Sequence, residues 1–109
     1  MSFEIQTISV FEKQAKRLVK KYSSLKIELL NLIQELKENP QTGTSLGQNC
    51  FKIRIAISSK GKGKSGGARI ITNVMIEDNI VYLINIYDKS EKENLPDKEL
   101  SELLKDIPK

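Results

Sequence analysis

The chain has 109 residues, enough for one small domain with its own core, and we expect a single domain over residues 1–109. It contains 18 basic and 14 acidic residues, one cysteine and no histidine, and its net charge is +4. The single Cys50 excludes an intramolecular disulfide and, without histidine, argues against a zinc site, so we expect a packing role for it and no metal or cofactor. Because no apolar run is long enough for a signal peptide or a membrane helix, we expect a cytoplasmic protein that does not bind membranes.

The first predicted elements are a short strand and a helix. Apolar and polar residues alternate over residues 3–8, which indicates a strand. Ser9 and Glu12 then stand at the N-cap and N3 positions of a capping box. Apolar residues recur with helical spacing over residues 11–22, which predicts an amphipathic helix.

A second helix is predicted immediately afterwards. The same apolar spacing runs over residues 25–36, and a Ser-Ser turn before it can cap it. The helix should end at Asn39, because the residue before Pro40 is pushed out of the helical region. The two helices then form an antiparallel hairpin, and residues 41–49 are predicted to be a polar loop.

The second half of the chain predicts three strands and a helix, over residues 51–57, 68–76, 80–87 and 98–106, the last capped by Asp97. A helical hairpin followed by a run of strands is typical of an α+β fold. We therefore expect an N-terminal strand and a helical hairpin packed on a mostly antiparallel four-stranded sheet, with a C-terminal helix.

The middle of the chain is basic without any compensating acid. Residues 39–76 contain no Asp or Glu, while six cations fall there: Lys52, Arg54, Lys60, Lys62, Lys64 and Arg69. Ordinary protein surfaces intersperse the two signs, so a segment of this kind is a local feature that a phosphate backbone would attract.

Strand alternation predicts where these cations lie. Arg54 and Arg69 flank one hairpin loop and fall on the polar faces of their strands, while Lys60, Lys62 and Lys64 lie in the loop. Five cations should therefore line one side of the sheet or its rim. The alternative is a solvated, flexible, lysine-rich hairpin tip with no binding role.

Two motifs together carry a resemblance to a known family. The run from Lys60 through the Gly66-Gly67 pair to Ile71, followed by the segment 83–91 (LINIYDKSE), resembles the RelE/ParE toxin superfamily, and within it the HigB-like branch. The helical hairpin and the closing helix also match, so the resemblance covers nearly the whole chain and implies a RelE-like fold.

The resemblance implies a toxin of a type II toxin–antitoxin system that enters the ribosomal A site and cleaves mRNA there without metal. In such endoribonucleases the 2′-hydroxyl of the RNA attacks the adjacent phosphate. The protein has to deprotonate that hydroxyl, stabilise the added negative charge and protonate the leaving oxygen. Without histidine, Lys, Tyr or Arg must do this, and a lysine among other cations is suited to act as a base because its charged form is disfavoured.

The resemblance also implies roles for individual residues. Arg69 is the expected transition-state clamp, because guanidinium groups bind phosphoryl oxygens. Lys89 corresponds to the C-terminal catalytic cation of the family. The remaining residues are Lys64 and Lys62 as base or phosphate contact, Arg54 and Lys60 in phosphate binding, and Tyr87 or Tyr82 stacking on an unpaired base, although Tyr82 is also a natural core residue.

The expected partners are mRNA, the ribosome and a cognate antitoxin. Charge complementarity predicts an acidic antitoxin segment over the basic face, and the HigB-like resemblance implies a helix-turn-helix antitoxin encoded next to the toxin. Two alternatives stay open: a ParE-like inhibitor of DNA gyrase, which shares the fold and cleaves nothing, and a non-catalytic module that binds RNA or the ribosome through the same cations.

Overall fold

The computed structural model describes residues 2–61 and 63–108, which form one five-stranded sheet with three α-helices. The elements in chain order are β1 (Glu4–Thr7), α1 (Ser9–Lys21), α2 (Leu25–Glu38), β2 (Thr44–Gly47), β3 (Cys50–Ile55), β4 (Ala68–Met75), β5 (Ile80–Asp88) and α3 (Asp97–Leu104). Short 3-10 turns lie at Ser58–Lys60, Lys64–Gly66 and Ile76–Asp78.

The strand order is β1-β5-β4-β3-β2, with β1 parallel to β5 and every other neighbouring pair antiparallel. This confirms the α+β class and the mostly antiparallel sheet. The expected number of four strands is wrong, because Thr44–Gly47 pairs with β3 inside the segment predicted to be a polar loop. All four residues of β2 are exposed, so no apolar alternation marks this strand in the sequence.

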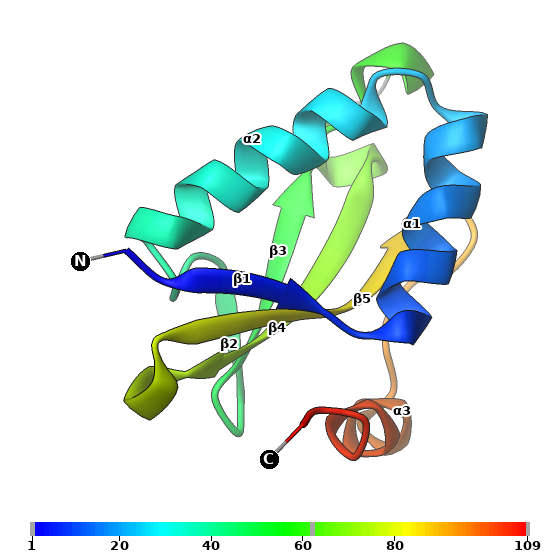
Figure 1. Ribbon diagram of the computed structural model, residues 1–109. Helices are drawn as coiled ribbons and strands as arrows, with labels where there is room; N and C mark the ends of the chain where they lie inside the picture. The colour runs from blue at the N-terminus through cyan, green and yellow to red at the C-terminus, as the bar shows by residue number, and fades with distance from the viewer. Residues whose placement is uncertain (1, 62, 109) are drawn as a thin grey trace.

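The helical hairpin and the closing helix lie on different sides of the sheet. In Figure 1, α1 and α2 lie over the sheet and α3 lies below it. The predicted end of α2 is confirmed, since the helix ends at Glu38, directly before Asn39-Pro40. None of the helices in the described part of the chain is long and apolar enough to cross a membrane.

The predicted caps are wrong, although the helices are where the periodicity places them. Helix α1 already includes Ser9, no side chain caps it, and the partner of Glu12 is instead the Thr7 hydroxyl, 2.5 Å from its Oε2. Likewise α3 begins at Asp97 itself, after Pro96. Both helices therefore depend on their packing rather than on a side-chain cap.

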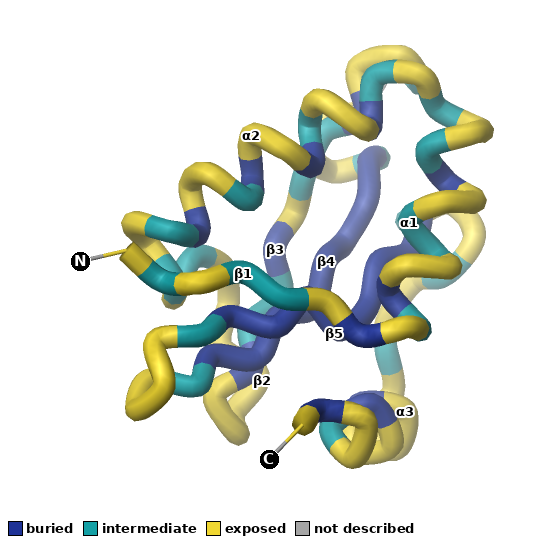
Figure 2. The backbone as a smooth tube through the Cα atoms, viewed as in Figure 1, coloured by how far each residue is buried: buried dark blue, intermediate teal, exposed yellow. Residues whose placement is uncertain are grey.

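The core lies between the sheet and the inner faces of the helices. Strands β4 and β5 are buried along almost their whole length, while each helix turns only one side inward (Figure 2). The fully buried large side chains include Leu18 of α1, Leu25 and Leu36 of α2, and Ile70, Leu83 and Ile86 of the sheet. Burying a side chain of this size contributes about 1.5–3 kcal/mol, so these contacts dominate the stability of the fold.

Helix α1 also covers the part of β5 that has no strand beside it. The pairing of β1 with β5 ends at Thr7 opposite Leu83, which leaves the far half of β5 open on that side. The amide N–H of Ile86 donates there to Oε1 of Gln14, at 3.0 Å. A helix side chain thus satisfies a buried strand amide and fixes the end of β5, where the candidate site lies.

Candidate functional site

Three side chains from three adjacent strands form a row across one face of the sheet. Arg54 of β3 lies directly opposite Arg69 of β4, and Arg69 lies directly opposite Tyr87 of β5. Directly opposed residues of antiparallel strands share a face, with Cβ atoms about 4.5–5.5 Å apart. The prediction that Arg54 and Arg69 share one face is confirmed.

Arg69 is buried, with 4 % of its surface exposed, although it carries a charge. Its Nη1 donates to the carbonyl oxygens of Lys64 (2.8 Å) and Ala68 (3.2 Å), and its Nη2 donates to that of Ser65 (3.1 Å). Burial lowers the pKa of the Arg69 guanidinium, and the charge of Arg54 lowers it further. Of its five N–H groups, two remain for another partner.

The turn that supplies these carbonyls is held by a glycine. Gly67 follows the Lys64–Gly66 turn, and a Cβ atom placed on it would lie 2.1 Å from the carbonyl oxygen of Ile55 and 3.0 Å from Cα of Ala56. Only glycine allows β3 and the start of β4 to approach so closely. The Gly67 carbonyl also accepts the amide N–H of Lys89 at 3.0 Å, which ties the turn to the end of β5.

Lys60 is paired with an acid, contrary to the expectation that the cations of the middle segment have no acid nearby. Its Nζ lies 2.6 Å from Oδ1 of Asp88, and the carboxylate is fully buried. That expectation is wrong for Lys60 because Asp88, distant in sequence, ends β5 beside the loop. The ammonium also donates to the carbonyl of Gly66 and to Oγ of Ser90, each at 3.0 Å, so its three donors are all engaged.

The lysines predicted to act as base, proton donor or phosphate contact are Lys64, Lys89 and Lys62, and none of the described ones is paired with an acid as Lys60 is. Lys64 is exposed and lines, with Arg54, a groove of about 290 Å³ between α2 and β3 that also contains Glu28 and Glu35. Lys89 is half-buried just beyond β5, and its Nζ donates to the carbonyl of Glu93 at 3.2 Å. Lys62 lies outside the described residues.

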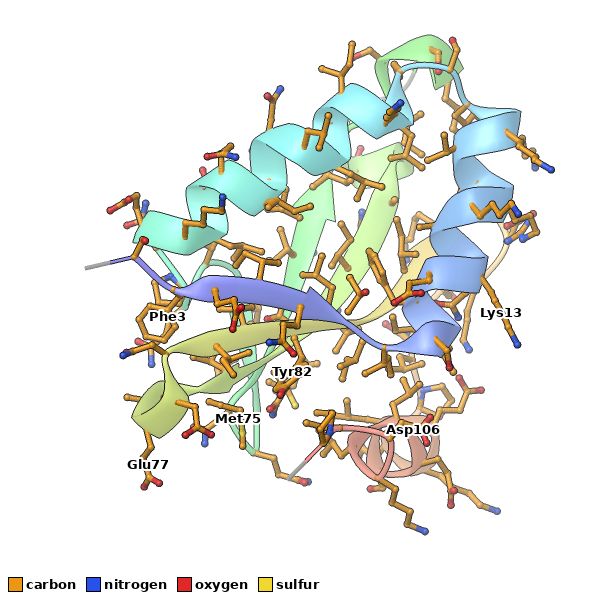
Figure 3. All side chains as sticks on the ribbon, viewed as in Figure 1. Phe3, Lys13, Met75, Glu77, Tyr82 and Asp106 are labelled. Carbon is orange, nitrogen blue, oxygen red and sulfur yellow. The ribbon has the colours of Figure 1, made fainter. Side chains whose placement is uncertain are left out.

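Both candidate stacking tyrosines are buried, each with 5 % of its surface exposed. Figure 3 shows Tyr82 on the side of the sheet where α3 lies, in keeping with a core residue. The Tyr87 ring is too buried to stack on a base in this conformation. Its hydroxyl is buried without a hydrogen-bond partner among the described residues, and burial raises its pKa although Arg69 opposes the shift.

The site residue that the sequence did not reveal is Asp88. Its carboxylate accepts hydrogen bonds from Lys60, from the Tyr22 hydroxyl (2.5 Å) and from the amide and hydroxyl of Ser90 (2.9 and 2.8 Å). Burial alone would raise the pKa of Asp88, but these hydrogen bonds outweigh it and hold the pKa far below its usual range. A charged residue at the end of the most apolar strand was the available signal.

The positive charge of the row and of the lysines beside it is not neutralised within the described part of the chain. Arg54, Arg69, Lys64 and Lys89 make no ion pair with any acid of the described chain. Two arginines held opposite each other repel unless negative charge comes between or beside them. Such a cationic row on the sheet of a small α+β domain has the charge and geometry that suit an anion such as a phosphate.

The comparisons with known proteins identify the family. A family model described as the RelE toxin of the RelE/RelB toxin–antitoxin system matches residues 8–108, and the chain belongs to this family. The fold also matches solved structures of E. coli RelE. A mutant toxin in the free state and the same toxin with an antitoxin RelBc peptide are 21% and 20% identical to this chain, each with a TM-score of 0.63 over 99% of this chain and 100% of the toxin.

The toxin in the intact E. coli RelBE toxin–antitoxin complex is 20% identical, with a TM-score of 0.63 over 80% of this chain and 96% of that one. At this level of identity the structures show a shared fold. The RelE-like fold that the two sequence motifs implied is thereby confirmed.

Proposed function

We propose that this RelE-family chain is an endoribonuclease that cleaves mRNA on the ribosome, with the cationic row as its active site. The family match and the segregation of positive charge on one sheet face support this function. The glycine-rich loop resembles the HigB-like signature, which supports our proposal that the chain is of that branch.

The observation that carries the proposal is the opposition of Arg54 and Arg69. Two like charges directly across a ladder destabilise a sheet, and one of these is also buried. A phosphate between them would turn that repulsion into two charge-assisted contacts. The arrangement therefore favours a site that binds an anion over a solvated hairpin tip.

In the proposed reaction the RNA 2′-oxygen attacks its own 3′-phosphorus, and the bond from phosphorus to the 5′-oxygen of the next nucleotide breaks. The products are a 2′,3′-cyclic phosphate and a free 5′-hydroxyl. Arg69 stabilises the charge that grows on the non-bridging oxygens, with Arg54 beside it as a phosphate ligand. Lys64 is the candidate base for the 2′-hydroxyl, and Lys89 is the candidate donor to the leaving 5′-oxygen.

The buried residues of the row need a small rearrangement to act in this way. Three of the Arg69 donors point at backbone carbonyls, two of them in the Lys64–Gly66 turn. A phosphate can accept hydrogen bonds from the two N–H groups of Arg69 that have no partner. If the Lys64–Gly66 turn moves aside, the N–H groups that now donate to the turn also become available. The unpartnered hydroxyl of Tyr87, directly opposite Arg69, is a further donor for a phosphate oxygen.

A RelE-family toxin requires an antitoxin, and we propose an acidic partner segment that covers the cationic row. The RelBE complex and the toxin–peptide complex from E. coli provide the precedent for a toxin of this fold bound to its antitoxin. An acidic segment would neutralise Arg54 and compete with RNA for the same face. The HigB-like signature favours an antitoxin that is encoded nearby and carries a helix-turn-helix domain.

The test is primer extension on a defined mRNA in a translating extract, with the wild type, Arg69→Ala, Arg69→Lys and the control Lys105→Ala. Lys105 lies directly after the last residue of α3 and is exposed, so its variant should cleave like the wild type. Discrete cuts that require translation and disappear with Arg69→Ala are expected, and Arg69→Lys should restore little because a single ammonium cannot replace the planar fork.

The same experiment separates the alternatives. Intact mRNA together with growth arrest in cells would point to a gyrase inhibitor, to be checked by a DNA supercoiling assay. Intact mRNA without arrest would leave a binding module. RNA affinity of such a module should decline gradually as cations are removed one at a time, whereas catalysis should collapse with Arg69 alone.

A further inference from the structure

We propose that Lys60 and Asp88 are a positioning pair that holds the Lys64–Gly66 turn against Arg69 and so sets the orientation of its guanidinium. The proposal rests on the function proposed above for Arg69. It reassigns Lys60 from phosphate binding to a role inside the protein, and it gives Asp88 a role that the reaction itself does not require.

The Asp88 carboxylate is the fixed point of this arrangement. It is fully buried, and it ends β5 directly after Tyr87, which lies opposite Arg69. Four donors converge on it from three parts of the chain: Lys60 in the loop, Tyr22 at the end of α1, and the amide and hydroxyl of Ser90. A carboxylate with this many donors has no freedom to rotate.

Lys60 connects the Asp88 carboxylate to the loop. The side chain is 14 % exposed, and its Nζ joins Asp88 to the carbonyl oxygen of Gly66, six residues further along. It also lies over the Tyr22 ring, 5.7 Å from the ring centroid. Its ammonium has no donor left for RNA, so this cation closes the loop instead of extending the binding surface.

The turn that Lys60 closes is the one that contacts Arg69. Gly66 ends the turn, and the two residues before it, Lys64 and Ser65, present their carbonyl oxygens to the guanidinium at 2.8 and 3.1 Å. The contacts therefore run without a gap from Asp88 through Lys60 and the turn to Arg69. On the other side, the amide of Lys89, the residue after Asp88, donates to the Gly67 carbonyl.

Stability alone is a weak reason for this pair. A buried ion pair is often no more stabilising than an apolar pair of the same size, because both charges lose their hydration. Its value here is geometric, since one fixed carboxylate places the turn and with it two cations of the proposed reaction, Lys64 and Arg69. A clamp must be held closely in its productive orientation to act on a transition state.

The test compares Lys60→Gln with the matched control Lys105→Gln, using two readouts. The first is solvent exchange of the Arg69 guanidinium N–H groups, followed by NMR of arginine side chains in the free protein. We expect Lys60→Gln to speed this exchange by at least about tenfold, because the turn loosens, and Lys105→Gln to leave it unchanged. Unchanged exchange in a folded Lys60→Gln variant would overturn the proposal.

The second readout is cleavage of mRNA. We expect Lys60→Gln to lower the cleavage rate at saturating RNA by about tenfold while the affinity for RNA changes by less than about twofold. In the Arg69→Lys background the same substitution should cost less than about twofold, because residues that act through one another are not additive. Equal costs in both backgrounds would show that Lys60 does not act through Arg69.

A second variant and the independence of the NMR readout from cleavage keep the proposal testable. If Lys60→Gln does not fold, Tyr22→Phe removes a single donor from Asp88 and should give a smaller change in Arg69 exchange in the same direction, and no change would again overturn the proposal. If the wild type cleaves nothing, the proposed function fails, whereas the NMR comparison still decides whether the pair positions Arg69.

Discussion

Replacing Arg54 by glutamine should stabilise the fold while it weakens RNA binding. Arg54 is exposed and lies directly opposite the buried Arg69, whose pKa is lowered by burial and then by Arg54. Like charges directly opposite on a sheet cost about 0.2–1 kcal/mol. Glutamine keeps most of the side-chain stem and removes the charge, so the repulsion is lost and little else changes.

The expected gain is about 0.5 kcal/mol, because Arg54 is well solvated and its charge is screened. For a domain of this size that corresponds to a rise of roughly 2–4 °C in Tm, which is measurable by calorimetry. The gain should shrink at about 1 M salt, where the screening length falls to about 3 Å. Lys52→Gln is the matched control, since Lys52 lies on the same strand and face opposite the apolar Ile71 and should give no gain.

The cost should appear in RNA binding. The logarithm of the RNA-binding constant falls linearly with the logarithm of the salt concentration. For single-stranded RNA, loss of one phosphate contact should make this slope less steep by about 0.7. Repulsion between Arg54 and Arg69 does not destabilise the fold if Arg54→Gln is no more stable than Lys52→Gln. The same conclusion holds if the gain in stability of Arg54→Gln persists unchanged in high salt. An unchanged salt slope would remove Arg54 from the proposed RNA site.

Three other predictions concern single positions. Gly67→Ala should destabilise the fold by about 1–3 kcal/mol, because the new methyl overlaps the Ile55 carbonyl, while Gly63→Ala, with nothing within 4 Å, should be neutral in the same urea titrations. The lowered pKa of Asp88 in the folded protein contributes stability above its unfolded pKa of about 4, and this stability is lost as pH falls toward the folded value. The free energy of unfolding should therefore fall less steeply with decreasing pH in Asp88→Asn than in the wild type. Equal slopes for the two proteins would contradict this. Burial raises the pKa of the Cys50 thiol, so it should react with a thiol reagent only after unfolding, and rapid labelling of the folded protein would be evidence against its burial.

Periodicity was sufficient to predict most of the fold. The helices follow apolar stripes that the core requires, and the alternation in β3 leaves Arg54 exposed between half-buried and buried apolar residues. Strand β2 gave no such signal, because all its residues are exposed and it is defined only by its hydrogen bonds to β3. Its hairpin turn places Gln48 and Asn49 at positive φ, and of these two only Asn is commonly found there.

The candidate site was harder to predict because it depends on contacts between distant segments. Alternation placed Arg54 and Arg69 on one face, but it could not show that Lys60 meets Asp88 across 28 residues of chain. Alternation also fails along β5, where a register shift opposite Ile71 and Thr72 lets Tyr82 and Tyr87 share a face. Their positions differ by five, which in a regular strand would put them on opposite faces. Charge counted along a sequence is therefore a guide to the surface and not to the ion pairs.

This distinction changes the proposed chemistry. The sequence predicts five cations along one side of the sheet or its rim, Lys60 among them. With Lys60 engaged by Asp88, the positive charge of the described face lies at the row, at Lys52 on the same strand as Arg54, and at Lys64 and Lys89. A site of this size fits one scissile phosphate and its neighbours, because each further phosphate would need a cation of its own. Affinity for a whole mRNA would then have to come from elsewhere, and under the function proposed above the ribosome would provide it.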